Sequence, residues 1–347
     1  MAFGSGLSAQ VGFAAESSYG TLATVDHFYE HDEANLDWNP TWAEGMGLHA
    51  GGQYKRASRA TVTTADASGP FKCDWVDKKM GLLVRHMLGS ATATPTLING
   101  TSYKQVHQVG NAAGLSLSTQ IGIPRADGTV EPFTYPGTKI AGWKIGSSEG
   151  GLLTLELDLD AKDELTTATT PAGPALAAAS YATPLAAFNH TQCVIKLGGT
   201  ASTATGVVSI AGGTTIATLC RSLGVEHTTP LANKRYGTGS RKSEQLQNGY
   251  SGTIVTFDNE FLNRTEWYDV LRTGNAVPLQ MTWTGPVAIS GANFPTVDLV
   301  IPAVKIKTDK VAGNGQDLSN QPLELEVYDD SVNNPFQLTI ISADSTL

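Results

Sequence analysis

The chain has 347 residues, a formal net charge of −9 at pH 7, 41% hydrophobic residues and 37 glycines. This hydrophobic fraction is enough to bury one large core or two ordinary ones, so intrinsic disorder is not expected. The negative charge argues against stable sequence-independent binding to DNA or RNA, because neutralisation of phosphates by Lys and Arg supplies most of that affinity. Abundant Gly, Thr and Ser, with few helix-favouring residues, favour many short strands joined by turns.

Cysteine usage and the N-terminal residues indicate the compartment. Cys73, Cys193 and Cys220 lie far apart and lack a Cys-x-x-Cys spacing, so we expect free thiols in a reduced environment and no structural zinc. Residues 1–20 lack the basic start and the apolar segment of a signal peptide, which favours synthesis and folding in a cytoplasm. The uncharged runs 166–189 and 197–220 contain too much Gly, Thr, Ser and Pro for a membrane-spanning helix, and no membrane association is expected.

The first candidate site is at His27 and His31, which flank Glu30 in an acidic segment. If residues 25–31 form a strand, the two imidazoles lie four residues and about 13 Å apart on one face. Two ligands so far apart cannot chelate a single ion. We therefore interpret this segment as a solvated polar strand face and expect no metal site.

A loop is predicted for residues 45–59. The glycines at 45–52 are not followed by Lys-Ser/Thr or by a helix pattern, so they do not predict a phosphate-binding loop. Lys55, Arg56 and Arg59 form a basic cluster without interleaved aromatic residues. This cluster is typical of a solvated loop, or of a contact for an acidic neighbour, rather than of a nucleic-acid site.

Two helices are expected among the strands. Asp74 can cap a helix over 74–88, and Gly89 stands where a left-handed C-terminal cap is expected. The apolar stripe of this helix consists of Val76, Met80, Leu83, Val84 and Met87. A shorter helix over 265–272 follows Asn263, precedes Gly274 and has Trp267, Val270 and Leu271 on one face.

Glycine-containing dipeptides predict tight hairpin turns between segments of strand pattern. The four are Asn99-Gly100, Asp127-Gly128, Gly150-Gly151 and Gly212-Gly213. Such dipeptides tolerate the positive φ angles that these turns require. Most of the chain is therefore predicted to be antiparallel sheet, apart from 166–183, which is rich in Ala, Thr and Pro and reads as an exposed loop or linker.

Two segments alternate leucine with acidic residues at a strict period of two. In 152–160, leucines 153, 155, 157 and 159 share one face, and Thr154, Glu156, Asp158 and Asp160 share the other. In 322–330, Leu323, Leu325 and Val327 lie opposite Glu324, Glu326 and Tyr328. We expect two half-buried strands, each with a row of negative charge facing water.

No catalytic constellation is predicted, and an enzyme is not expected. Residues 146–150 match Gly-x-Ser-x-Gly, but a strand follows where a nucleophile elbow needs a helix, so a hairpin turn is favoured. Asp158, Asp160 and Asp163 lack the glycine and the final acid of a calcium loop, and do not suffice for a glycosidase pair. We expect no cofactor and no catalytic, cofactor-binding or metal-binding residue.

Several segments together resemble the tail tube proteins of long-tailed bacteriophages. They are residues 11–21, the aromatic and acidic stretch 27–38, the helix end 81–89, the hairpins of 115–144 with 132–135 and 137–143, the acidic strand 152–164, and 235–240, 249–261, 299–306 and 323–330. The resemblance covers most of the chain except about 165–225. It implies a mainly β fold of two packed antiparallel sheets, as a sandwich or half-barrel, with a flanking α-helix and a second short helix.

The resemblance also implies an organisation and a function. Residues 1–164 and 226–347 form one tail-tube β domain, and 165–225 is an insertion or a small extra β subdomain. The chain is then a structural virion protein that forms stacked, six-membered rings, with the tape-measure, tail terminator and distal tail proteins as partners. Double-stranded DNA passes through such a tube without specific binding. The alternatives are a tail terminator, a decoration protein, a tube protein of a contractile tail, an extracellular β-sandwich binding module and a β-rich hydrolase.

Overall fold

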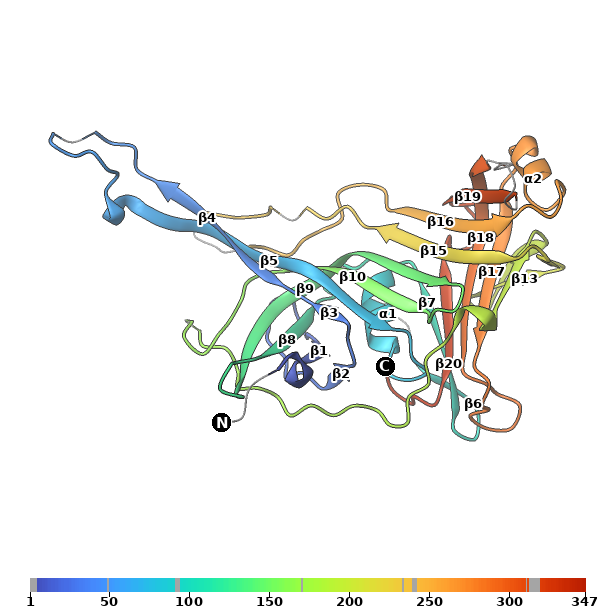
Figure 1. Ribbon diagram of the computed structural model, residues 1–347, viewed down its shortest axis with the longest axis horizontal. Helices are drawn as coiled ribbons and strands as arrows, with labels where there is room; N and C mark the ends of the chain where they lie inside the picture. Colours follow the sequence, from blue (N-terminus) through green and yellow to red (C-terminus); the bar gives the residue numbers. More distant parts are fainter. Residues whose placement is uncertain are drawn as a thin grey trace.

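The computed structural model describes residues 5–48, 50–90, 94–169, 171–232, 234–238, 242–309, 311 and 319–347. The fold is mainly β with antiparallel sheets and two helices, as predicted, and is consistent with a β-sandwich (Figure 1). A small sheet and a large sheet share one long strand, and a two-stranded hairpin outside both ladders packs on the large sheet, where Val208 bonds to Gln337. Short 3-10 turns occupy Gly6–Ser8, Ala57–Arg59 and His190–Gln192.

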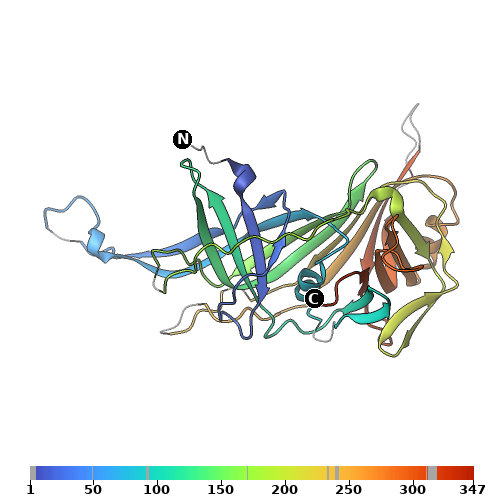
Figure 2. The same ribbon diagram turned by 90° about the horizontal axis from the view of Figure 1, so that it is seen from below.

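The small sheet contains β2 (His27–Tyr29), β1 (Gln10–Ala15), β8 (Leu117–Pro124) and the first half of β9 (Val130–Ser148). Its strands cross those of the large sheet at a steep angle (Figure 2). β9 joins the two sheets because it changes direction near Gly137, whose φ of 65° favours glycine. From Lys139 onward, β9 belongs to the large sheet.

The large sheet has a long row of strands and a branch at its far end. In order, the row is β4 (Asp37–Glu44), β5 (Ala60–Asp74), β10 (Thr154–Ala161), the second half of β9, β15 (Cys220–Thr228), β16 (Gly252–Glu260), β19 (Asn320–Val327) and β18 (Thr296–Asp309), with β3 (Glu33–Ala34) also on β5. The branch continues from β18 to β17 (Val277–Thr284), β11 (Cys193–Leu197) and β14 (Thr214–Thr215), and separately to β20 (Gln337–Ser342), β7 (Ser102–Gln108) and β6 (Thr96–Asn99).

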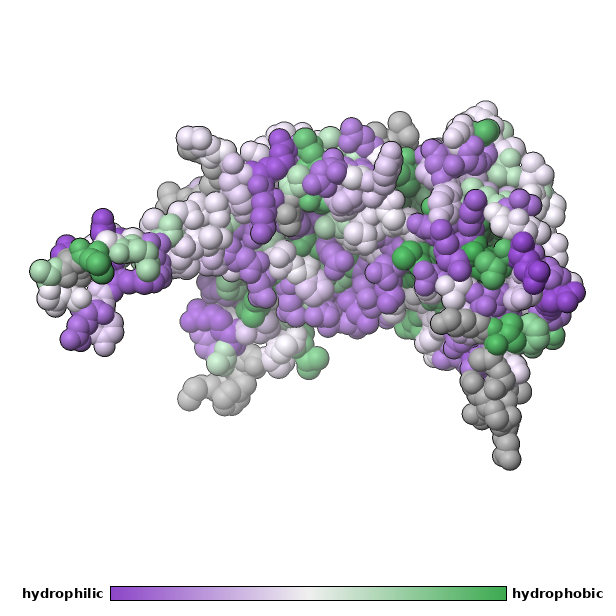
Figure 3. All heavy atoms as spheres, turned by 90° about the horizontal axis from the view of Figure 1, so that it is seen from above, coloured by the Kyte–Doolittle hydropathy of each residue, from purple (hydrophilic) through white to green (hydrophobic). Residues whose placement is uncertain are grey.

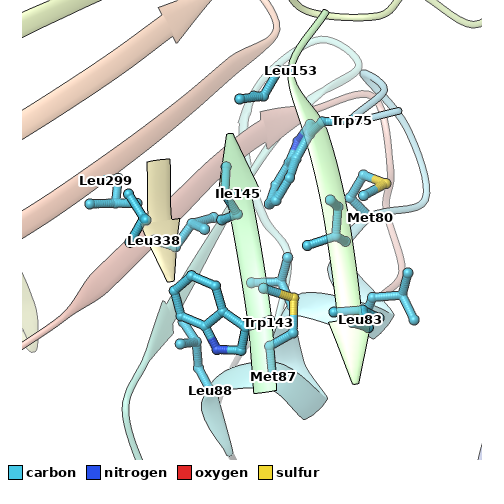
Figure 4. Packing of buried hydrophobic residues seen from close by; sticks show 14 of the residues in the cluster. Trp75, Met80, Leu83, Met87, Leu88, Trp143, Ile145, Leu153, Leu299 and Leu338 are labelled. Carbon is cyan, nitrogen blue, oxygen red and sulfur yellow. The ribbon is translucent and has the colours of Figure 1, made fainter. Parts of the chain in front are cut away.

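The predicted first helix is shorter than expected and more deeply buried. β5 continues through Asp74, and α1 (Gly81–Leu88) begins after Met80, so the expected start and the Asp74 cap are wrong. Its end is confirmed, since Gly89 adopts a φ of 67° as a left-handed cap. The helix does not simply flank the sheets: all of its residues except Arg85 are buried. Its side chains pack against Trp75 and Trp143 in the main core (Figure 4).

The second helix is present, although it begins at Tyr268 and not at 265, and three of the four hairpins are confirmed. α2 (Tyr268–Thr273) follows a turn capped by the Asn263 side chain, ends at the left-handed Gly274, and is preceded by the fully buried Trp267. β6 pairs with β7, β8 with β9, and β9 with β10 across the predicted turns. The turn at Gly212-Gly213 is not a hairpin, because β13 (Val207–Ala211) pairs with β12 (Thr200–Ala204) while β14 pairs with β11.

Residues 165–225 contribute to several parts of the structure. Residues 171–189 run mostly without regular structure, and β12 with β13 form the separate hairpin. β11 extends the edge beyond β17, whereas β15, which starts at Cys220, lies between β9 and β16 in the large sheet. The interpretation of this segment as an insertion stays a prediction.

Candidate functional site

The Gly-x-Ser-x-Gly segment lies in the β9–β10 hairpin, as predicted. The Ser147 hydroxyl donates to Nδ1 of His190 at 2.9 Å, and Nε2 of His190 donates to the Cys220 carbonyl oxygen at 2.7 Å. Nothing in the sequence indicated this Ser–His contact. Ser147 is only 7% exposed, and a backbone carbonyl, not a carboxylate, orients the imidazole. The pair joins β9 to the start of β15 and does not have the geometry of an activated surface nucleophile.

The histidines of the acidic segment do not converge. β2 covers only 27–29, so the strand expected over 25–31 is shorter and His31 lies beyond it. The His27 ring contacts the Asp26 carboxylate at 2.7 Å and a main-chain oxygen of Leu347 at 2.8 Å. Among the residues that the structure describes, no three His, Cys, Asp or Glu side chains are placed to hold a metal ion. The three cysteines are free, and burial raises the pKa of the Cys220 thiol to about 12, which keeps it protonated at neutral pH.

The hairpin of β4 and β5 leaves the body as a long arm, defined here as residues 37–68 (Figure 1). The predicted loop 45–59 forms its tip. Within the tip, Lys55 pairs with Glu44, and the Arg59 side chain lies against Gly45 and Gly47. The basic cluster is thus partly engaged by the arm itself.

One face of the arm is apolar and has no covering layer. Trp38 and Trp42 share this face of β4, and Trp38 lies opposite Ala67, a fully buried member of the main core. The row of apolar side chains that faces the core therefore continues along the arm beyond the body, where Trp38 and Trp42 are 41% and 57% exposed. Met46, Leu48 and Tyr54 are also exposed, at the tip, where hydrophobic residues are visible in Figure 3. An isolated two-stranded ribbon is only marginally stable, so such a face marks a contact surface.

The opposite face of the large sheet is its open face, and its charges alternate. One cross-strand row reads Lys72, Glu156, Lys144, Glu226, Ile254, Glu326 and Lys305. Glu326 also pairs with Lys307 at 2.8 Å, and the hydrogen bonds from Lys307 and Tyr328 lower the pKa of the Glu326 carboxyl. The leucine faces of β10 and β19 are buried as predicted, but the acidic faces are not rows of uncompensated charge.

Asp160 departs from the predicted pattern. It was expected to face water with Glu156 and Asp158, yet it is only 7% exposed and pairs with the buried Lys242. Burial raises the pKa of the Asp160 carboxyl, while the bond to Lys242 acts in the opposite direction. Asp158 remains exposed, so the solvent-facing part of β10 ends there.

A family model described as phage tail tube protein matches residues 6–327. The chain belongs to the phage tail tube protein family. The match spans the arm, the strands of the open face and residues 165–225. No curated protein matches the chain.

Membership makes the chain a structural protein of the phage tail, and the family is of a non-enzymatic kind. In the described part of this tail tube protein, no helix is both long enough and apolar enough to cross a membrane.

Proposed function

We propose that this tail tube protein assembles with copies of itself into stacked rings that form the conduit for genome ejection. Six subunits per ring is the number that the sequence resemblance implies. The observation that carries the proposal is the apolar face of the arm, which continues the core of one subunit into solvent. A second copy of the chain is the partner that fits best, since the family implies self-assembly.

Unpaired strand edges support the same conclusion. Among the described residues, β2 pairs only with β1, and β6 only with β7. Free edges expose unpaired N–H and C=O groups that invite uncontrolled pairing. A closed ring of subunits covers such edges, as closed barrels do.

We infer that the open face of the large sheet lines the lumen. DNA carries about one negative charge per 1.7 Å of axis, so free lysines would hold it through phosphate contacts. Here Lys72 is already engaged by Glu156 and Lys307 by Glu326. Lys144 and Lys305 stand beside acidic residues of neighbouring strands, and a lumen in which lysines alternate with acids in this way lets double-stranded DNA pass without specific binding.

The remaining partners follow from the position of a tube in a tail. Its ends meet the tail terminator and the distal tail proteins, and its interior holds the tape-measure protein before the genome enters. The subunit is made in the host cytoplasm and becomes part of the virion. Along the described row of the open face, lysines alternate with acids, which opposes retention of the genome.

Sedimentation velocity of the purified chain tests self-assembly through the arm. The wild-type protein should form large assemblies as concentration rises, whereas Trp42→Ser combined with Leu48→Ser should remain a subunit with an unchanged thermal midpoint. Thr41→Ser, an exposed change on the other face of β4, is the matched control and should assemble normally. Equal assembly of the double variant and the wild type would rule out the arm as the contact.

A further inference from the structure

A second long loop holds the root of the arm. Residues 229–251, named here the clasp, connect β15 to β16 and are described except for 233 and 239–241. The clasp folds back on itself, with the Ala232 amide donating to the Leu246 carbonyl at 2.8 Å and the Asn248 amide to Pro230 at 2.9 Å. It extends from the body in the same direction as the arm (Figure 1).

The clasp inserts a lysine between two carboxylates. The Lys242 side chain is fully buried; its ammonium pairs with Asp160, donates to the Ala161 carbonyl at 3.2 Å and lies 3.5 Å from Asp66. The Tyr236 hydroxyl adds a hydrogen bond of 3.3 Å to Asp66. A buried lysine is costly unless its charge is matched, so these carboxylates define where the clasp sits.

The two carboxylates belong to different parts of the subunit. Pairing of β10 with β5 ends where Ala161 faces Ala67, so Asp66 is the first residue of the arm on β5 that is not paired with body strand β10. Asp160, in contrast, belongs to body strand β10. Lys242 therefore connects the arm to the body at the point where the ribbon loses its neighbouring strand.

Polar contacts also hold the clasp on the side of the body. A hollow of about 160 Å³ lies between its residues Leu231 and Gln247 and the end of α1. On the body side, the Glu244 carboxylate accepts from Lys139 at 2.6 Å and from the Gly114 amide at 2.5 Å. Two ionic contacts, Lys242 with Asp160 and Glu244 with Lys139, therefore anchor the clasp to the body.

We propose that Lys242 is a positioning residue that fixes the direction of the arm. Without its ammonium, the ionic link between Asp66 of the arm and Asp160 of the body is lost, and the hydrogen bond from Tyr236 ends on Asp66 and does not replace that link. The inference rests on the proposed role of the arm in assembly, because arm direction decides where the apolar face meets the next subunit. Lys242 would then be required for assembly although it lies outside the contact surface.

The test measures arm direction and assembly separately. Spin labels at Ala43→Cys on the arm and Thr256→Cys on β16, both exposed positions, report the arm–body distance in a background without the three native cysteines. Lys242→Met is compared with Lys234→Met, an exposed lysine of the same clasp. Lys242→Met leaves the buried Asp160 carboxylate without its cation. The combination with Asp160→Asn removes that charge and serves as the test protein if Lys242→Met alone does not fold.

We expect one narrow distance distribution for the parent protein and for Lys234→Met, and a broad one for Lys242→Met or its Asp160→Asn combination. Sedimentation should show loss of assemblies only for the Lys242 variants. A narrow, unshifted distribution in a folded Lys242 variant would overturn the inference, whether or not the protein assembles. If the parent protein does not assemble but the distance distribution of the Lys242 variant is broad, the proposed function is rejected and the positioning role of Lys242 is retained.

Discussion

Glu156 on β10 stands directly opposite Lys72 on β5, and their carboxylate and ammonium groups lie 3.1 Å apart on the open face of the large sheet. On its other side, Glu156 faces Lys144 of β9. Both partners of the Lys72 pair are partly exposed, so the pair contributes little to stability. Its effect is to remove local charge from a surface that we place against DNA.

Reversing this charge should change DNA transit more than folding. Glu156→Lys places a third cation between Lys72 and Lys144, and its stability should fall by no more than about 1 kcal/mol because the site is exposed. Particles carrying it should eject DNA slowly, with partial rescue at high salt, since phosphate contacts weaken with ionic strength. Glu149→Lys, in the adjacent turn, is the control. A normal ejection rate for Glu156→Lys would remove this face from the lumen.

Leu83 should be among the most sensitive core positions. It is fully buried on α1 in the main cluster, so Leu83→Ala should lower the free energy of unfolding by about 2–5 kcal/mol through lost burial and a residual cavity. Leu97→Ala, at a side chain 56% exposed on β6, should stay within about 0.5 kcal/mol. Urea unfolding of the subunit measures both. Equal stability of Leu83→Ala and the wild type would contradict the placement of α1 in the core.

The subunit should lose stability on acidification. Burial lowers the pKa of His86 and His227 to about 4 and that of His107 to about 3. Unfolded histidine titrates near pH 6.5, so between about pH 4 and pH 6.5 the unfolded state binds more protons than the native state. The stability that the neutral, buried histidines contribute is therefore complete above about pH 6.5 and is lost as pH falls toward 4. The carboxyls of Asp160 and Asp344, whose pKa burial raises, act in the opposite sense.

Comparison with His227→Gln isolates the histidine contribution. His227 stacks on Trp143, and its ring bonds to the hydroxyls of Thr253 and Thr229, so glutamine preserves polar contacts without a titrating charge. The drop in urea midpoint from about pH 7.5 to pH 5 should be smaller in this variant. An identical drop in both proteins would show that His227 is not neutral in the native state.

Local pattern predicted the faces of individual strands but not what covers them. The alternation around Leu157 placed every leucine of β10 correctly, because a strand period of two is a local property. Asp160 was misplaced because its partner Lys242 lies 82 residues later in the chain. The pairing depends on tertiary structure that no local window contains.

The predictions of a helix start at Asp74 and of a hairpin at Gly212-Gly213 are wrong for similar reasons. Asp74 is a good capping residue, but β10 pairs with β5 up to that position and keeps it extended. Gly212-Gly213 makes a turn, yet the strand beside β13 is β12, which precedes it. Of the surfaces that we propose for assembly, the loop at 45–59 was predicted from sequence as a loop. The apolar arm face was not, because Trp38 and Trp42 read as ordinary strand residues until their register with β5 is known.

Negative-stain electron microscopy of the purified 347-residue chain at increasing concentration tests self-assembly into a tube most directly. We predict hollow tubes, or short stacks of rings, whose lumen is visible end-on. The Trp42→Ser and Leu48→Ser double variant should give single particles at the same concentrations. Fields that contain only isolated subunits of the wild-type chain at every concentration would contradict the proposed assembly.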